Sequence, residues 1–233
     1  MNKKLYRSIL SKCAEYTKTK FDSGDFAEFG CCPGVSAPIL ASIFRRNGCF
    51  FDTWSGVPHF DEVDVPSDEH EECIKRAMKK SKYRSKNKNM KSPMKVFKNT
   101  LKQNNLLKYC EMIKGDICKT VPEFMVNQPD DKFVFAHIDC NQHEPAKVSL
   151  FEFWLHLVPG GIVYFDDYKD PMWPGIEKAV NEFKEQHSGY SFVDLNPCGI
   201  NNGILFKGDL EELQQVLDYI GLDSTDGIII EQG

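Results

Sequence analysis

Three aspartates stand directly after two apolar segments of the chain, at positions where packing does not call for an acid. Asp139 closes residues 132–139, and Asp166 and Asp167 close residues 162–167. Carboxylates that converge repel each other unless a cation neutralises them, and such oxygen ligands suit Mg²⁺, Mn²⁺ or Ca²⁺. A divalent cation there would bind an acceptor hydroxyl, lower its pKa and aim its oxygen at an electrophile. The alternative is that Asp166 and Asp167 only cap a loop.

A second group of residues has the pattern of a nucleoside-cofactor site. Residues 25–30 form a short apolar run that predicts a buried strand. Gly30 and Gly34 then allow a tight turn and a close approach of the backbone to a ligand. A helix over 36–46 would begin near Ser36, with its unpaired N–H groups facing that ligand.

The spacing of these glycines argues against a dinucleotide. A dinucleotide fingerprint needs G-x-G-x-x-G, whereas Gly30 and Gly34 are separated by three residues. A second strand over 48–53 carries Asp52 near its end, and an acid there can accept both hydroxyls of a ribose. Together with Glu28, the pattern resembles motifs I and II of class I S-adenosylmethionine (SAM) methyltransferases.

Strands that alternate with helices predict a doubly wound α/β fold, with a mostly parallel seven-stranded sheet and helices on both faces. The expected strands cover residues 25–30, 48–53, 111–116, 132–139 and 162–167, followed by a hairpin of 190–195 and 203–207. The expected helices cover residues 4–20, 36–46, one or two stretches within 71–107 that break at Ser92-Pro93, and 145–157, 174–187 and 209–220.

The length of 233 residues suits one domain, 1–233, with a large core. We interpret residues 1–24 as an N-terminal helix or lid and residues 58–108 as a variable helical insertion. No apolar run is long enough to span a bilayer, and the N-terminal residues lack the apolar stretch of a secretory signal. The nine cysteines are scattered without C-x-x-C pairs, which favours reduced thiols and a cytoplasmic location.

Positive charge is concentrated in residues 75–108, which hold thirteen Lys and Arg and no Asp or Glu. The rest of the chain therefore carries 16 basic and 34 acidic side chains. We expect this basic block to be a mobile, exposed segment near the cofactor rim that attracts an anionic acceptor. A solvated helical face is the simpler interpretation, and a phosphate footprint for nucleic acid is a third.

Five motifs occur in order along the chain, and a sixth segment, Ala-Val-x-x-Phe (179–183), follows them. The motifs are Asp-Phe-Ala-Glu-Phe-Gly (25–30), Phe-Asp-Thr-Trp-Ser-Gly-Val-Pro (51–58), Lys-Gly-Asp-Ile-Cys-Lys-Thr-Val-Pro (114–122), His-Ile-Asp-Cys-Asn (137–141) and Val-Pro-Gly-Gly-Ile-Val-Tyr-Phe-Asp-Asp-Tyr (158–168). With these motifs, residues 25–187 resemble the macrocin O-methyltransferase family.

The resemblance implies an enzyme that uses SAM and a divalent cation, Mg²⁺ or Mn²⁺, to methylate sugar hydroxyls of antibiotics and glycans. It also suggests a homodimer or a higher oligomer. The cofactor residues that it implies are Glu28, Gly30, Gly34 and Asp52, with Asp116 near the adenine. The metal ligands that it implies are Asp139, Asp166 and Asp167, and we assign Ser36 and Asp139 to the cofactor site as well.

The chain departs from the family pattern at the position of a candidate general base. The family usually has Ile-Asp-x-Asp-x-Tyr-x-Ser, and Asn141 replaces the second Asp here. Asn141 cannot take a proton at neutral pH, whereas His143 can, because its reference pKa lies near that range. Alternatively, the cation alone acidifies the hydroxyl. We expect His137 to be structural.

Three classes of function fit these residues. The leading one is methyl transfer from SAM to the hydroxyl of a sugar, in a nucleotide sugar, a glycan or a glycosylated metabolite. The second is a nucleic-acid methyltransferase, although the chain outside the basic block is acidic and base methylation does not require three metal-binding acids. The third is a protein that binds SAM without catalysis.

Overall fold

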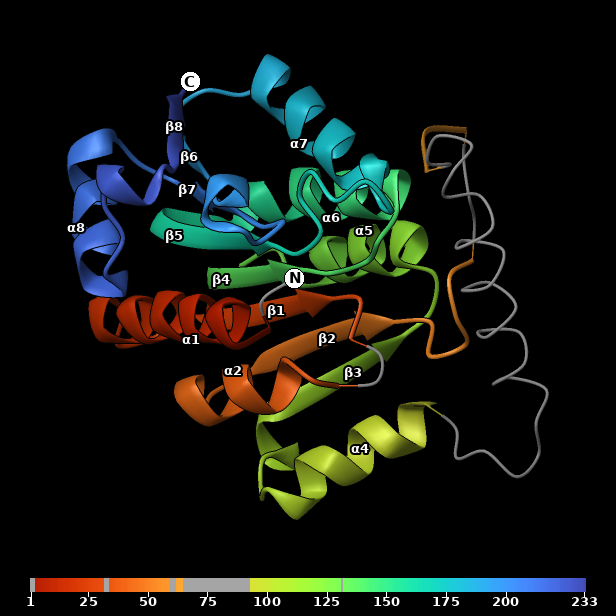
Figure 1. Cartoon of the computed structure of the whole chain (residues 1–233). Coiled ribbons are helices and arrows are strands. Elements are labelled where there is room, and N and C mark those ends of the chain that lie inside the picture. The colour runs from red at the N-terminus through yellow and green to blue at the C-terminus, as the bar shows by residue number, and fades with distance from the viewer. Residues whose placement is uncertain (1–2, 32–33, 59–61, 65–92, 131) are drawn as a thin grey trace.

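One mixed sheet forms the centre of the protein (Figure 1). The computed structural model describes residues 3–31, 34–58, 62–64, 93–130 and 132–233. Within these residues the sheet has eight strands in the order β3-β2-β1-β4-β5-β7-β6-β8. The strands are β1 (Asp25–Phe29), β2 (Gly48–Asp52), β3 (Cys110–Lys114), β4 (Phe133–Ile138), β5 (Leu157–Phe165), β6 (Ser191–Asp194), β7 (Gly203–Phe206) and β8 (Ile229–Gln232).

The first five strands are parallel, and their order reverses between β1 and β4. In an open parallel sheet, such a reversal leaves a crevice beyond the carboxyl ends of the two strands, where ligands bind. Strands β2 and β4 are buried along their whole length, as expected for parallel strands covered on both faces. The topology therefore predicts that ligand-binding residues follow β1 and β4.

The antiparallel half of the sheet contains the predicted hairpin of β6 and β7, and it also contains β8. The expected count of seven strands was therefore one too low. All residues of β8 are exposed, and the strand is defined only by its pairing with β6, so no hydrophobic alternation marks it in the sequence.

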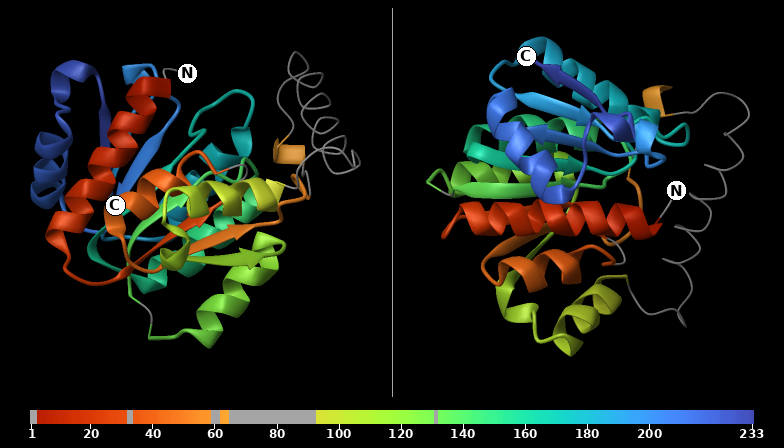
Figure 2. Two further views of the ribbon diagram at one scale, coloured as in Figure 1. Left: turned by 90° about the horizontal axis from the view of Figure 1, so that it is seen from below. Right: turned by 60° about the vertical axis from the view of Figure 1, so that its left-hand side comes forward.

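Two helical layers cover the sheet, as Figures 1 and 2 show. One layer packs in the order α8, α1, α2 and α4, and the other in the order α5, α6 and α7. The helices are α1 (Lys3–Lys20), α2 (Ala37–Phe44), α4 (Pro93–Gln103), α5 (Ile117–Asn127), α6 (His143–His156), α7 (Pro174–Gln186) and α8 (Leu210–Ile220). This α/β/α arrangement confirms the predicted doubly wound fold.

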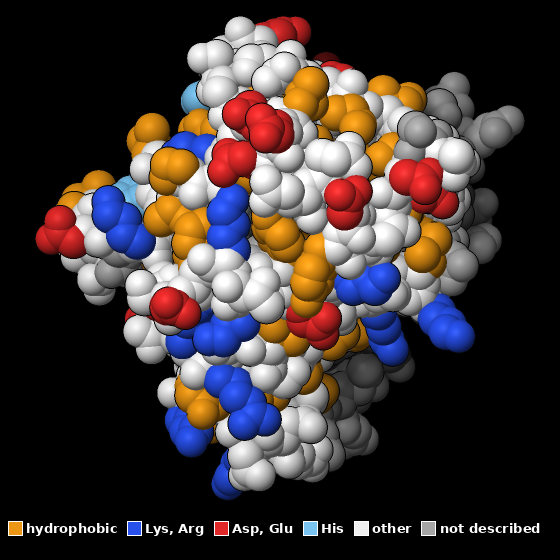
Figure 3. Space-filling view, turned by 90° about the vertical axis from the view of Figure 1, so that its left-hand side faces the viewer, with side chains coloured by type: hydrophobic (Ala, Val, Ile, Leu, Met, Phe, Trp, Pro, Cys, Tyr) orange, Lys and Arg blue, Asp and Glu red, His pale blue; other side chains and the backbone are white. Residues whose placement is uncertain are grey.

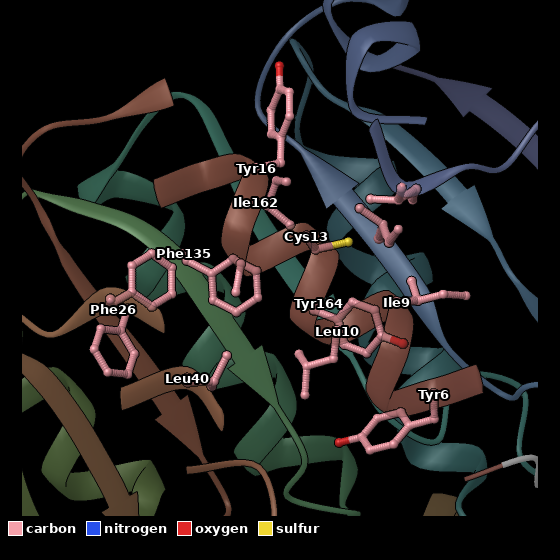
Figure 4. Packing of buried hydrophobic residues seen from close by; sticks show 14 of the residues in the cluster. Tyr6, Ile9, Leu10, Cys13, Tyr16, Phe26, Leu40, Phe135, Ile162 and Tyr164 are labelled. Atoms are coloured by element: carbon pink, nitrogen blue, oxygen red, sulfur yellow. The ribbon is translucent and has the colours of Figure 1, made fainter. Parts of the chain in front are cut away.

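A separate hydrophobic cluster lies on each face of the sheet. Figure 4 shows the first cluster, where Leu10 and Cys13 of α1 lie close to Phe135 of β4 and Tyr164 of β5. Leu10 and Cys13 are fully buried. The N-terminal helix is therefore part of the core. Its Tyr6 belongs to this cluster and reaches His137, near the carboxyl end of β4.

Helix α5 is the main element that the sequence patterns missed. It begins after Asp116, whose side chain accepts a hydrogen bond from the backbone N–H of Cys118. Pro122 lies inside the helix, and a proline in that position usually argues against one. Helix α4 begins at Pro93, where the Ser-Pro break was expected. The basic block lies outside the described residues except for its last part, from Pro93 onward.

Figure 3 shows the face on the left of Figure 1, at the amino ends of the parallel strands, where basic and acidic side chains are mixed with hydrophobic ones. A polar pocket of about 340 Å³ at these ends includes Asp25 and Asn47. It lies at the opposite end of the strands from the acidic residues that follow β4 and β5. Among the described helices, none is long and apolar enough to cross a membrane.

Candidate active site

Backbone hydrogen bonds continue beyond the ends of β4 and β5 and align the acidic residues that follow these two strands. The N–H of Asp139 donates to the carbonyl of Phe29 at 2.8 Å. The N–H of Asp166 donates to the carbonyl of Ile138 at 3.0 Å. Asp139 therefore lies beside the end of β1, and Asp166 lies beside Asp139. The structure thus brings these two predicted site residues to the carboxyl ends of β1 and β4, where the strand order reverses.

The two glycines of the predicted cofactor turn are required by the fold itself. Gly30 has φ +89°, and a Cβ at this position would lie 2.1 Å from the carbonyl oxygen of Asp139. Gly34 has φ +92°, and a Cβ there would lie 2.7 Å from the ring of Phe97. Both residues therefore have positive φ and closely packed surroundings, conditions that only glycine meets without strain.

Asp52 links the turn after β1 to the turn after β2. Its carboxylate accepts a hydrogen bond from the backbone N–H of Cys31 at 2.7 Å and another from the N–H of Trp54. The side chain is 8% exposed. The predicted ribose acceptor is thus already oriented by the backbone, at the end of β2, beside the glycine turn.

Glu28 and Ser36, both predicted cofactor residues, are in direct contact. Glu28 is fully buried on β1, and its Oε1 accepts a hydrogen bond from the hydroxyl of Ser36, at the start of α2. The same oxygen lies 3.6 Å from Nδ1 of His137 on β4. Glu28 therefore joins β1, β4 and the beginning of α2 beneath the turn.

A group of three side chains at this edge could hold a metal ion, but its membership differs from the prediction. Among the described residues it consists of His137, Asp139 and Asp166, each with one ligand atom within 4.8 Å of the others. Asp167, the third predicted ligand, is not in this group. Its Oδ2 instead accepts a hydrogen bond from the side-chain amide of Asn141.

The electrostatics of this edge are unfavourable for three negative charges. Burial and the neighbouring carboxylates raise the pKa of Asp139 well above its usual value. Burial also raises the pKa of Asp166, although His137 and the amide of Asn202 act in the opposite direction. Burial and Asp166 raise the pKa of Asp167 to about 8. A cation beside these groups would relieve the repulsion.

His143 is at the start of α6, and its ring contacts a residue of α7. Nε2 lies 3.2 Å from Oε1 of Glu182, which also forms an ion pair with Lys147. The backbone N–H of His143 donates to Oδ1 of Asp64 at 2.7 Å, so the buried Asp64 caps α6 from a distant part of the sequence. In this arrangement Nε2 of the predicted base faces the carboxylate of Glu182.

Three residues of this region were missed in the sequence: Asn202, Asp64 and Glu182. Asn202, fully buried between β6 and β7, donates its amide to Asp166 Oδ1 at 2.8 Å and to the carbonyl of Phe165 at 2.9 Å. No local pattern marks these residues, because each meets the site through a contact distant in sequence. His137 was seen in the sequence but interpreted as structural, although it alternates with Asp139 on one face of a strand.

Comparisons with known proteins identify the class of this fold. The family described as "Methyltransferase domain" matches residues 27–168. Similar solved structures include the calicheamicin methyltransferase CalS11, with 23% identity, a TM-score of 0.59 and coverage of 86% of this chain and 79% of that chain. The O-methyltransferase NovP has 20% identity, a TM-score of 0.63 and coverage of 88% and 79%.

A further similar structure is an O-methyltransferase from Bacillus cereus in complex with SAH, with 12% identity, a TM-score of 0.56 and coverage of 88% of this chain and 80% of that chain. A search of curated proteins gave no match.

The family match covers more than half of the chain, from β1 to the turn after β5, so the chain belongs to the methyltransferase domain family. The solved structures show that its fold is that of class I methyltransferases. Family and fold together confirm the predicted class of enzyme, a methyltransferase that uses SAM.

Proposed function

We propose that this protein transfers a methyl group from SAM to a hydroxyl of a sugar, with a divalent cation at the carboxyl ends of β4 and β5. The observation that carries the proposal is the pair Asp139 and Asp166 next to the glycine turn of β1. The motifs that resemble the macrocin O-methyltransferase family support a sugar acceptor. So does the likeness to CalS11, which is described as a TDP-rhamnose 3′-O-methyltransferase.

The residues of the β1–β2 edge fit a nucleoside cofactor. Asp52 is the last residue of β2 and Asp116 follows β3, so their carboxylates lie at the ends of neighbouring strands. Asp52 would accept the ribose hydroxyls, and Asp116 would lie near the adenine. Gly30, Gly34 and the buried pair of Glu28 and Ser36 would shape the turn on which the cofactor rests. SAM supplies the electrophilic methyl group when it is bound.

We expect Asp52→Ala to weaken SAM binding by about 1–3 kcal/mol, because charge-assisted hydrogen bonds to the ribose are lost. The same change frees the N–H groups of Cys31 and Trp54, so the turn itself should loosen. Isothermal titration calorimetry with SAM measures the affinity. Asp116→Ala is the matched comparison at the next strand, and an unchanged affinity for Asp52→Ala would rule out the ribose assignment.

The residues at the β4–β5 edge fit a divalent cation. Burial raises the pKa values of Asp139 and Asp166, and the neighbouring carboxylates add to the shift of Asp139. A cation held there would acidify the acceptor hydroxyl and orient its oxygen. Asp167 was predicted as a third ligand. It lies outside the group of three possible ligands, next to Asp166 in the chain, and accepts a hydrogen bond from Asn141.

Removal of the proton from the acceptor hydroxyl involves either His143 or the cation alone. Because the ring of His143 contacts Glu182, we favour the alternative in which the cation alone acidifies the hydroxyl. We then expect His143→Gln to lower kcat by less than about tenfold, whereas loss of a general base typically costs about 10²–10⁴-fold. The kcat value and the acid limb of the pH–rate profile measure this. A loss of a hundredfold or more, with disappearance of that limb, would restore His143 as the base.

The experiment that tests the proposal is a methyl-transfer assay with SAM and a panel of acceptors. The panel contains TDP-linked sugars, neutral glycosides, an acidic oligosaccharide and RNA, and mass spectrometry detects the gain of one CH₂ per transfer. We expect transfer to a sugar hydroxyl. Transfer only to RNA would favour the nucleic-acid alternative, and SAM binding without transfer to any acceptor would favour a non-catalytic protein.

Two further expectations accompany this function and stay predictions. The first is that an anionic acceptor is attracted by the basic block, most of which lies outside the described residues. The dependence of KM on ionic strength for a charged and a neutral acceptor tests it, because electrostatic attraction weakens as salt rises. The second is a homodimer or higher oligomer, which sedimentation would measure.

A further inference from the structure

His137 occupies a buried polar row on the face of the sheet that α1 covers. It pairs laterally with Glu28 of β1 and with Tyr164 of β5. The imidazole is fully buried, yet its Nδ1 has no hydrogen-bond partner within the described part of the chain. The 3.6 Å that separate it from Glu28 Oε1 exceed a hydrogen-bond length. Buried polar atoms are nearly always satisfied, so this nitrogen calls for a partner.

Two carboxylates lie beside this ring. One ligand atom each from His137, Asp139 and Asp166 lie within 4.8 Å of one another. The alternation of side chains along a strand explains part of this, because His137 and Asp139 are two positions apart and emerge on the same face. Asp166 joins them through the backbone hydrogen bond that extends β5 alongside β4.

Tyr6 of α1 contacts the other ring nitrogen of His137. Its hydroxyl lies 3.4 Å from Nε2 of His137. A neutral imidazole carries a proton on one nitrogen and a lone pair on the other, and the partner of the protonated nitrogen fixes which one can bind a metal. With the proton on Nε2 and shared with Tyr6, the second nitrogen is available as a ligand.

We propose that His137 is a ligand of the divalent cation, together with Asp139 and Asp166, and that Tyr6 positions its ring. This inference rests on the proposed metal-dependent function and changes its ligand set from three carboxylates to one imidazole and two carboxylates. Imidazole suits first-row transition metals better than Mg²⁺ or Ca²⁺, and of these metals Mn²⁺ also accepts carboxylate ligands readily. The site should therefore bind Mn²⁺ more tightly than Mg²⁺.

Pulsed electron paramagnetic resonance of the Mn²⁺-loaded full-length protein tests the proposal directly. We expect couplings from a ¹⁴N nucleus bound to Mn²⁺, and we expect them to be replaced by ¹⁵N couplings in protein made with ¹⁵N-labelled histidine. This measurement needs no substitution and no methyl transfer, so a variant that fails to fold cannot obscure it.

Substitutions then identify the histidine whose nitrogen is bound to Mn²⁺. His137→Gln should remove the nitrogen coupling and weaken Mn²⁺ binding by at least about tenfold. It should also reduce the preference for Mn²⁺ over Mg²⁺. His143→Gln is the matched control, because His143 is a neighbouring histidine whose ring contacts Glu182, and this variant should retain the coupling.

The outcomes separate this inference from the function on which it rests. If Mn²⁺ binds and Asp139→Asn abolishes binding, but no nitrogen coupling is seen, the ligand assignment is overturned while the metal-dependent function stands. If the coupling disappears in His143→Gln rather than in His137→Gln, the assignment is also overturned. If no Mn²⁺ binds even at millimolar concentration, both the ligand assignment and the metal-dependent function fail.

Discussion

Asp166→Asn should lower methyl transfer by on the order of 10³-fold, and EDTA should have a similar effect on the unaltered protein. A cation that polarises an oxygen supplies several kcal/mol of stabilisation in the transition state, and each 1.36 kcal/mol is worth about tenfold in rate. The asparagine keeps the shape of the side chain and can still accept the amide hydrogen bond of Asn202. The loss should therefore come from the missing charge.

The same substitution should stabilise the metal-free protein. Asp166 is a partly buried carboxylate that raises the pKa values of Asp139 and Asp167 by repulsion. If its neutralisation is worth about 1 kcal/mol, Tm should rise by roughly 2–4 °C for a chain of this size. Calorimetry in EDTA measures the rise, and SAM affinity is the control for folding. Full activity of the unaltered protein after exhaustive chelation would reject a metal mechanism, and so would full activity of Asp166→Asn.

The metal-free protein should lose stability as pH rises from about 4 to about 8. Asp139, Asp166 and Asp167 all have pKa values raised above those of an unfolded chain, where aspartate titrates near 3.9. Protonation of these groups therefore favours the folded state. Their contribution is fully present below about pH 4 and is lost as pH rises through the folded pKa values, which for Asp167 is about 8.

We expect this loss to reach a few kcal/mol, which corresponds to a fall in Tm on the order of 10 °C. Thermal unfolding in EDTA at several pH values measures it. The Asp167→Asn variant should show a smaller fall, and saturating Mn²⁺ should oppose the fall, because metal affinity rises as the ligands lose protons. A metal-free protein whose Tm stays level or rises over this range would show that these acids are not destabilised by their surroundings.

The sequence alone was enough to predict the fold class and the edge of the sheet at which Asp139 and Asp166 lie. Five short apolar runs separated by helix-length segments require a parallel sheet, because parallel strands need crossover connections. Gly30 and Gly34 follow the first of these runs, and Asp139 and Asp166 follow two others. Because the carboxyl ends of parallel strands share one edge, a local pattern of apolar residues and acids was enough to bring these side chains together.

Helix α5 and strand β8 were harder to predict, because the local sequence of each does not favour the structure that it forms. Helix α5 contains Pro122, which from sequence reads as a helix breaker, yet packing against α6 and the cap from Asp116 suffice to form it. Strand β8 has no buried face and exists only through its pairing with β6. In both cases tertiary contacts outweigh the local preference of the chain.

The sequence by itself determined the fold class and the edge of the sheet at which the candidate site residues gather, because both follow from the order of strands, glycines and acids along the chain. SAM as the methyl donor came from the resemblance of the motifs to class I methyltransferases, which the family match confirms. Only the tertiary structure decided which side chains share one small volume. Cross-strand register placed His137 beside Glu28, a turn directed Asp167 toward Asn141, and packing between α6 and α7 set His143 against Glu182. These choices depend on distances of a few ångströms between residues far apart in the chain, and residue order does not specify them.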